Sequence, residues 1–220
     1  HILKELEEET DEIFPIYINC WQTTTSFKIM IEICNQLGYK FTQNKKTEEL
    51  TKVVKDIINQ NSGAVIIFDE IDKVEDTDFL YLLLEEVYRK TIILITNYKS
   101  WFTQVDERTR SRLIPDLLEF KEYTEQETIE ILKARMQYAF VPNVWDDDAF
   151  NLLAKKAAEM KDIRTGLFLI KEAGQIAEDK SKKKIEKEDA LQAITKLESF
   201  SIKSSNDLVD IEKEKLEMIK

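Results

Sequence analysis

A run of apolar residues that ends in two carboxylates constrains the fold of this chain more than any other feature. Ala64-Val-Ile-Ile-Phe68 is followed at once by Asp69 and Glu70. An unbroken β-favouring run predicts a central parallel strand that is covered on both faces. Open α/β sheets bind ligands just beyond the carboxyl ends of such strands. Two carboxylates there could hold a metal ion through its waters and polarise an attacking water. The run also fits a buried strand that happens to end in acidic residues.

Length and composition favour a helix-rich protein of one large domain or two small ones. The 220 residues are 43% hydrophobic and include 4 glycines and 3 prolines, which leaves enough apolar material to bury a core. We find no stretch that could span a membrane, and the acidic start is unlike a signal peptide. The chain does not begin with methionine, so we expect it to be part of a longer protein.

Residues that commonly build catalytic and metal sites are scarce. Histidine occurs only as His1, which argues against histidine-based catalysis and histidine metal sites. Cys20 and Cys34 are too few for a disulfide scaffold or a zinc site. We interpret both as core thiols in a reducing cytoplasm.

The net charge of −11 argues against autonomous DNA binding, because contact with a phosphate backbone normally requires an excess of Lys and Arg. The lysine-rich run at residues 180–184 is the main candidate for a local DNA contact. Such a run is more often a solvated helix end.

Apolar periodicity predicts alternating strands and helices up to Tyr123, and helices alone thereafter. The Thr23-Thr-Thr-Ser26 run can cap one helix, Gly38 ends it, and Thr124 with Glu127 forms a capping box for a later one. Strands are expected at residues 15–20, 64–68, 91–97 and 117–120, and helices at 2–12, 26–37, 47–60, 78–90, 124–136, 146–159, 162–178 and 187–198. Such alternation implies a parallel sheet with right-handed crossovers. We therefore predict an α/β domain at residues 1–122, an all-helical domain at 123–198 and a linker or the start of a further domain at 199–220.

Further polar residues follow the second buried strand and open a helix of the helical domain. Asn97 ends its strand, and adjacent parallel strands would bring its amide beside Asp69, although Asn at a strand end is usually a turn residue. Arg108 and Arg112 lie in a charged stretch that fits either an exposed helix or fingers that neutralise a phosphate. Arg164 is either a solvated residue of a first helical turn or a residue aimed at the rim of the sheet.

Together these motifs resemble those of the AAA+ ATPases. Phe68-Asp-Glu-Ile-Asp72 resembles the Walker B motif, Asn97 the sensor 1 residue, Ser111-Arg112 the arginine-finger box and Arg164 the sensor 2 arginine. The likeness is finer to the archaeal and eukaryotic replication initiators, the origin recognition and Cdc-type loader proteins. It is carried by residues 17–20, 69–72, 95–97, 106–112, 123–135 and 162–177, and it runs from about residue 2 to residue 197.

The resemblance implies a parallel-sheet AAA+ base followed by a helical lid, with ATP or ADP and Mg²⁺ bound between them. By this resemblance Asp69 would hold Mg²⁺ through water, Glu70 would activate the attacking water and Asn97 would position it. The family's activity would be a slow ATP-dependent switch in DNA replication initiation.

The resemblance also implies contacts between subunits. Arg112, with Arg108 as the second candidate, would reach the nucleotide of a neighbouring subunit, and Arg164 would contact the γ-phosphate. The partners would be other AAA+ subunits and, for the complete protein, DNA. The acidic chain alone would bind DNA weakly or not at all, and no membrane contact is implied.

Three features depart from the family pattern. The Gly-rich phosphate-binding loop that ends in Gly-Lys-Ser or Gly-Lys-Thr is absent from this sequence, and that loop supplies the amide cradle for the phosphates. The family's winged-helix domain is also absent, although residues 208–220 could be its start. Lys161 stands where the sensor 2 motif usually has a glycine. We expect the chain alone to be inactive as an ATPase.

The missing loop has a structural consequence in this family. In this family the strand that carries the phosphate-binding loop lies beside the sensor 1 strand. Without that neighbour, the sensor 1 strand should expose an unpaired edge. We expect upstream residues to complete the sheet, unless residues 117–120 pair directly with residues 92–96. Two other functions remain open: another AAA+ loader or transposition-type ATPase, and a non-catalytic interaction module with the same fold.

Overall fold

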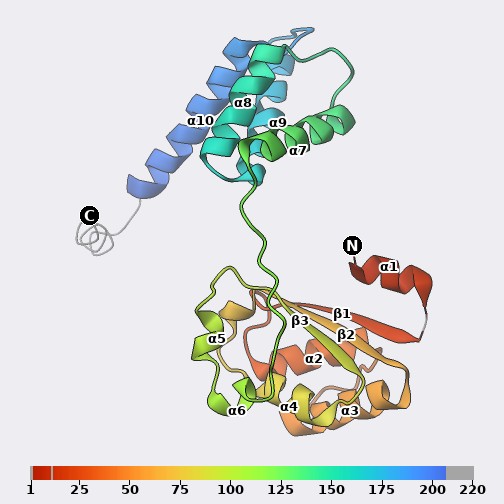
Figure 1. Ribbon diagram of the computed structural model, residues 1–220. Coiled ribbons are helices and arrows are strands. Elements are labelled where there is room, and N and C mark those ends of the chain that lie inside the picture. The colour runs from red at the N-terminus through yellow and green to blue at the C-terminus, as the bar shows by residue number, and fades with distance from the viewer. Residues whose placement is uncertain (1, 11, 207–220) are drawn as a thin grey trace. The chain divides into compact units, whose positions relative to one another are not determined.

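The computed structural model describes residues 2–10 and 12–206, in two compact units. We call His1–Leu117 the α/β unit and Leu118–Lys220 the helical unit, and each is described by itself (Figure 1). Within the described ranges, no helix is long and apolar enough to cross a membrane.

The α/β unit alternates strands and helices as the periodicity predicts. Its elements in chain order are α1 (Ile2–Glu9), β1 (Ile13–Asn19), α2 (Ser26–Gln36), α3 (Thr47–Gln60), β2 (Gly63–Asp69), the 3₁₀ turn η1 (Ile71–Lys73), α4 (Asp78–Glu86), β3 (Lys90–Leu94), α5 (Trp101–Gln104) and α6 (Glu107–Arg110). Thr25 caps α2 through its side chain, and α3 begins at Thr47. The predicted starts of these two helices are therefore confirmed.

The three strands form one parallel sheet in the order β1-β2-β3. In the register of the sheet, Ile16 lies opposite Ile66 and Ile66 opposite Ile92. The acid-ended strand β2 is therefore central, as its apolar run predicts. Because all three strands run in the same direction, their carboxyl ends meet at one edge of the sheet.

The two faces of the sheet are buried to different extents. Ile16, Ile18, Ile66 and Phe68 are fully buried in a core that α2, α3 and α4 share, and Figure 1 shows these helices along one face of the sheet. Residues of the opposite face alternate with them, and Tyr17 is 43% exposed there. The predicted coverage of both faces is thus complete only on the helix side.

The free edge of β1 is protected by a side chain rather than by a strand. Gln36 accepts a hydrogen bond from the Tyr17 backbone N–H at 3.0 Å and donates to the Tyr17 carbonyl at 2.8 Å. The amide of Gln36 thereby imitates the backbone of a neighbouring strand. This satisfies polar groups that would otherwise invite pairing with another chain.

The free edge of β3 has no neighbouring strand among the described residues. Ile95 donates its N–H to Phe68 and accepts from Ile71 through its carbonyl. Counting from Ile95, the backbone N–H and C=O groups of every second residue of β3 therefore point toward β2. Those of Ile92 and Leu94 point away from it. The Lys90 side chain turns back to donate to carbonyls at the end of α4.

The strand predicted at residues 117–120 does not form, and this part of the prediction is wrong. Leu117, Leu118 and Phe120 are 89%, 80% and 88% exposed, in a stretch without helix or strand. An apolar run needs a partner strand and a covering layer to become a strand, and neither is present here. This segment does not pair with β3.

The helical unit contains α7 (Glu125–Ala139), α8 (Asp147–Glu159), α9 (Ile163–Asp179) and α10 (Lys187–Asn206). Thr124 and Glu127 form the predicted capping box at the start of α7. A separate core includes Leu132, Leu153 and Leu169. The last helix extends beyond its predicted end at residue 198, into the segment expected to be a linker. Residues 207–220 lie outside the described part of the chain.

Three helices end in the same way, with a residue in the left-handed conformation. Gly38, Lys161 and Ser181 have φ values of 82°, 53° and 54°. After each of them the chain closes two hydrogen bonds back into the helix, for example from Lys161 to Ala158 and from Asp162 to Ala157. This is the Schellman pattern, in which glycine is the favoured residue. The glycine that the family resemblance predicts at position 161 therefore matches a real backbone requirement.

Candidate functional site

The carboxyl edge of the sheet is organised around Asp69, the last residue of β2. Its carboxylate accepts hydrogen bonds from the Tyr17 hydroxyl at 2.7 Å and from the Glu70 backbone N–H at 3.0 Å. The hydrogen bond to Asp69, followed by burial, raises the pKa of Tyr17. Tyr17 was not predicted as a site residue. It could have been found from the register, because it lies on β1 next to the end of β2 and on the face opposite the core.

Glu70 follows Asp69 in a strained backbone conformation. Its φ of 55° and ψ of 45° place it in the left-handed region, which costs a residue with a side chain on the order of 1–2 kcal/mol. Glu70 opens the turn η1 that leads away from the sheet. Strain of this kind is often found at functional sites. It fixes the direction in which the chain leaves β2.

A second carboxylate, Asp72, is tied down at the same edge. It accepts hydrogen bonds from Thr96 at 2.8 Å and pairs with Lys73 at 2.9 Å. Burial opposes ionisation of Asp72, but these donors outweigh it and lower the pKa of Asp72. The Lys73 ammonium lies 4.9 Å from the centroid of the Tyr98 ring and 5.6 Å from that of Trp21. Asp72 is thus occupied within the protein.

Asn97 lies in the loop that follows β3, three residues beyond the end of the strand. The ladder continues to Ile95, which bonds to Phe68, and Asn97 follows on the same edge as Asp69. The side chain of Asn97 is exposed. Asn97 thus follows β3 at the same edge of the sheet where Asp69 ends β2, and β3 ends earlier than predicted.

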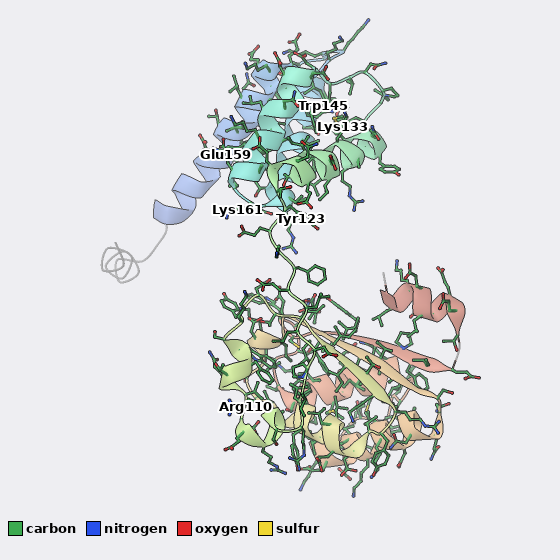
Figure 2. All side chains as sticks on the ribbon, in the orientation of Figure 1. Arg110, Tyr123, Lys133, Trp145, Glu159 and Lys161 are labelled. Carbon is green, nitrogen blue, oxygen red and sulfur yellow. The ribbon has the colours of Figure 1, made fainter. Side chains whose placement is uncertain are left out.

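The arginine-rich stretch packs against α4. Arg112 forms an ion pair with Glu85, which raises the pKa of Arg112. The guanidinium carbons of Arg108 and Arg112 lie 3.7 Å and 5.0 Å from the centroid of the Tyr81 ring. Arg110 (Figure 2) instead donates to the carbonyl of Thr103 at 3.4 Å. Neither Tyr81 nor Glu85 was predicted as part of a site, because their helix periodicity indicates only a partly buried face.

Arg164 belongs to the helical unit, where it lies in the first turn of α9. Asp162 caps this helix by accepting from the Arg164 backbone N–H at 2.8 Å and from the Thr165 hydroxyl at 2.8 Å. The Arg164 side chain is exposed. The described geometry therefore leaves it available for an external contact.

The residues at the sheet edge fit Mg²⁺ better than a metal held by protein ligands alone. Within residues 2–10 and 12–206, no group of three or more Cys, His, Asp or Glu side chains could hold a metal ion. Mg²⁺ is usually bound through one or two carboxylates, its own waters and substrate phosphates. Asp69, half of whose hydrogen-bond capacity remains after its bonds to Tyr17 and Glu70, suits that role when a phosphate ligand is present.

The lysine run at residues 180–184 is partly neutralised inside the helical unit. Asp189 is fully buried and accepts from Lys180 at 2.9 Å and from Lys182 at 3.0 Å. Lys182 also pairs with Glu186 at 2.8 Å. These bonds raise the pKa of Lys182 to about 12. The run therefore serves first to fix the α9–α10 connection, which weakens its case as a DNA contact.

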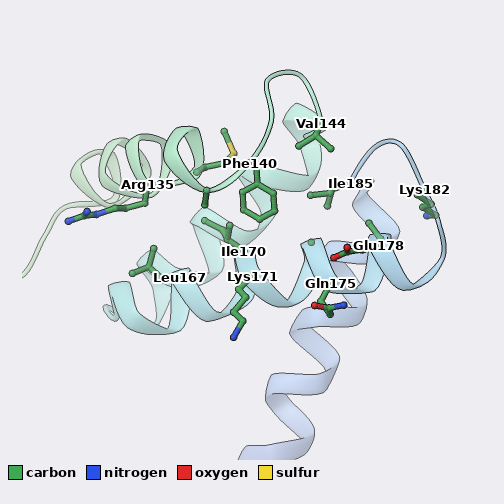
Figure 3. A pocket seen from close by; sticks show the side chains of 14 residues that line it. Arg135, Phe140, Val144, Leu167, Ile170, Lys171, Gln175, Glu178, Lys182 and Ile185 are labelled. Atoms are coloured by element: carbon green, nitrogen blue, oxygen red, sulfur yellow. The ribbon is translucent and has the colours of Figure 1, made fainter.

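The helical unit also has a hollow of about 570 Å³ between α7, α9 and the loops that follow them (Figure 3). Its floor is apolar and includes Phe140, Val144, Ile170 and Ile185. Phe140, labelled in Figure 3, packs edge-on against Trp145. Lys182 of the lysine run lines it, whereas Asp69, Glu70, Asn97, Arg108, Arg112 and Arg164 do not.

Comparison with known proteins gives a consistent family. Residues 129–195 match the Cdc6 AAA+ ATPase-type lid domain. The chain is 32% identical over 209 residues to ORC1-type DNA replication protein 1 of Sulfurisphaera tokodaii, a match that covers 90% of this chain and 52% of that protein. It is 30% identical over 193 residues to the protein of the same name from Methanothermobacter thermautotrophicus, covering 83% and 50%. The chain thus spans about half the length of these relatives.

Solved structures agree with the sequence matches. The Aeropyrum pernix ORC1 protein in complex with DNA superimposes with a TM-score of 0.76 at 26% identity, covering 89% of this chain and 55% of that one. Cdc6p from Pyrobaculum aerophilum has the same fold, with a TM-score of 0.75 at 16% identity, covering 87% and 55%. The parallel sheet followed by a helical unit, together with the likeness to these structures, identifies the AAA+ fold. Within that class the chain is similar to the replication initiators, the ORC1-type and Cdc6 proteins.

Proposed function

We propose that this chain forms the base and lid of an ATP-dependent switch that acts in DNA replication initiation. The observation that carries the proposal is the arrangement at the sheet edge, where Asp69, Glu70 and Asn97 follow neighbouring parallel strands. The similarity to ORC1-type and Cdc6 proteins supports the same function. Relatives named for DNA replication, and an ORC1 structure with DNA, support DNA as a partner of the complete protein.

Each residue of this edge has a distinct proposed role. Asp69 would hold Mg²⁺, Glu70 would act as general base toward the attacking water and Asn97 would orient that water. When bound, Mg²⁺ would neutralise charge on the phosphates. The left-handed backbone of Glu70 supports the proposal, because strain of this kind is often found at functional sites. Related structures solved in an ADP form and with ADPNP and ADP support ATP and ADP as the ligands.

The nucleotide is proposed to couple subunits. Arg164 of the lid would contact the γ-phosphate, and an arginine of the 108–112 stretch would reach the nucleotide of a neighbouring AAA+ subunit. Bound ATP would then favour assembly of the subunits, and slow hydrolysis of that ATP would allow the subunits to separate. The phosphate-binding loop needed for this cycle is absent from the 220 residues, so the cycle belongs to the complete protein.

The test is a Glu70→Gln substitution in the complete protein. This change keeps the size of the side chain but removes the base, so ATP binding should persist while hydrolysis falls by at least about 100-fold. Glu130→Gln, which alters an exposed carboxylate on α7, is the matched control and should leave both unchanged. Unchanged turnover in Glu70→Gln would remove Glu70 from the role of base.

A non-catalytic interaction module is the second candidate function. It is favoured by one observation, the absence of a phosphate cradle from this sequence. Titration of labelled ATP into the chain itself separates the two. We expect no micromolar binding, because the cradle contributes most of the phosphate contacts. Micromolar binding would show that the phosphate-binding loop is dispensable.

A further inference from the structure

The start of α6 is fixed against α4 by the hydrogen bonds of Asp106. Thr77, the N-cap residue of α4, donates its hydroxyl to Asp106 at 3.1 Å. Asp106 in turn caps α6 by accepting from the Thr109 backbone N–H at 2.9 Å, and Thr109 is buried. Figure 1 shows α4 and α6 side by side. The arginines that follow Asp106 therefore have a defined register against α4.

One aromatic ring then holds two guanidinium groups. Tyr81 lies one turn beyond Thr77 on α4, and Arg108 and Arg112 are four residues apart, so both can reach the same ring. Their guanidinium carbons are 3.7 Å and 5.0 Å from the ring centroid. A stacked guanidinium has one face covered, while its in-plane N–H groups stay available for an oxyanion. Stacking also removes side-chain freedom before any ligand binds.

The two arginines differ in what else they contact. Arg112 pairs with Glu85 and donates to the Arg108 carbonyl at 3.2 Å. In the described part of the chain, the Arg108 side chain has no hydrogen bond or ion pair. Its N–H donors are therefore available, whereas the Arg112 side chain is already anchored.

Carboxylates close to Arg108 make capture of a free anion unfavourable. Glu48, Asp76 and Asp78 line a hollow of about 450 Å³ together with Tyr81 and Arg108. Their negative charge would repel a free phosphate that approaches on its own. An arginine in this setting suits a phosphate that another protein surface already holds in place.

We propose that Tyr81 positions this pair, with Arg108 as the arginine that reaches a phosphate bound by a neighbouring subunit and Arg112 as its anchored companion. This inference rests on the proposed function, and it reverses the order in which the sequence ranks the two arginines. Tyr81 is a positioning residue, because it acts only through Arg108.

The stacking itself is tested in this chain by NMR of the arginine side chains. The ring current of Tyr81 should shift the Arg108 side-chain signals upfield. Tyr81→Phe keeps the ring and should keep that shift, whereas Tyr81→Leu should remove it. Arg108 signals that do not change in Tyr81→Leu would refute the stacking.

The proposed effect of Tyr81 on catalysis is tested by measuring ATP turnover of the complete protein in its assembled state. Tyr81→Leu should lower kcat by about 10- to 100-fold, the cost of a misplaced catalytic group, and leave KM for ATP unchanged because the neighbour binds the nucleotide. Tyr81→Phe should restore turnover. Arg108→Ala should lower kcat at least as far as Tyr81→Leu, and Arg112→Ala should lower it less.

The two proposals fail in distinguishable ways. If Glu70→Gln abolishes turnover but Tyr81→Leu does not lower it, the positioning role is refuted and the ATPase proposal stands. A loss on Arg112→Ala greater than that on Arg108→Ala would likewise overturn the assignment of Arg108. Turnover that survives Glu70→Gln would refute the role of Glu70 in the proposed function, whereas the NMR test of stacking would be unaffected.

Discussion

At the scale of single residues, backbone conformation explains side chains that sequence patterns leave ambiguous. Lys161 stands where the family usually has glycine, and its φ of 53° shows why glycine is favoured there. The residue ends α8 in a left-handed turn, a conformation that costs a side chain about 1 kcal/mol. The ion pair between Lys161 and Glu122, at 2.6 Å, is exposed and offsets little of that cost.

A Lys161→Gly substitution should therefore stabilise the helical unit. We expect the free energy of unfolding to rise by about 0.5–1 kcal/mol, because glycine adopts positive φ without steric cost. Lys155→Gly is the matched control, since Lys155 is an exposed residue within α8, and it should lower stability by about 1 kcal/mol. Denaturant unfolding measures both. A loss of stability in Lys161→Gly would show that Lys161 contributes more than its backbone conformation indicates.

Residue chemistry at the sheet edge was only partly predictable. Asp69, Glu70 and Asn97 could be found because an apolar run ending in polar residues is a local signal. Tyr17 and Tyr81 could not be found in this way, because their hydroxyl and ring act through partners about 50 and 30 residues away in sequence. The buried thiols were predictable: Cys20 and Cys34 are free and fully buried, and burial raises their pKa values to about 12 and about 11.

At the scale of elements, the α9–α10 connection depends on one buried carboxylate. Asp189 accepts from Lys180, from Lys182 and from the Glu186 backbone N–H at the start of α10. Burial opposes ionisation of Asp189, but these donors outweigh it and lower the pKa of Asp189 below 3.8. A folded-state pKa below the unfolded value contributes stability at higher pH, and that stability is lost as pH falls through the folded-state pKa.

An Asp189→Asn substitution should lower the stability of the helical unit by about 2 kcal/mol at pH 7, because it leaves two lysines without their shared partner. The difference from the unsubstituted chain should shrink as pH falls through the lowered folded-state pKa of Asp189, where its carboxyl also loses its charge. Asp179→Asn, at an exposed carboxylate that accepts from Gln175, should have little effect. Thermal unfolding at several pH values provides the measurement, and a pH-independent loss would contradict this account.

Element boundaries followed the sequence where a local cap marks them and departed from it elsewhere. Thr25, Gly38 and Thr124 mark helix ends correctly, because capping is a short-range interaction. The strand at residues 117–120 was predicted wrongly, since strand formation depends on a partner that no local pattern encodes. The end of α10 was predicted too early, because the polar residues after residue 198 do not prevent a helix from continuing.

At the scale of the whole molecule, the division into two units was visible as a change of periodicity. The predicted boundary near Tyr123 and the structural one after Leu117 lie in the same irregular stretch. The two hydrophobic cores share no residue. No sequence pattern in either unit specifies where Arg164 lies relative to Asp69.

The negative charge of the molecule disfavours DNA binding by this chain but is compatible with a nucleotide site that contains a divalent cation. With a net charge of −11 and much of the lysine run paired with Asp189 and Glu186, the chain has little electrostatic reason to bind DNA by itself. The acidic sheet edge suits a divalent cation with a polyphosphate. The account therefore depends on one spatial claim, that Asp69, Glu70 and Asn97 share a metal–nucleotide site.

Paramagnetic Mn²⁺ in place of Mg²⁺ tests that claim most directly. Added with ATP to the isotope-labelled complete protein, Mn²⁺ should broaden the backbone NMR signals of Asp69, Glu70 and Asn97 together, and Asp69→Asn should greatly weaken that broadening. Broadening centred elsewhere in the α/β unit, with these three signals left sharp, would contradict the account.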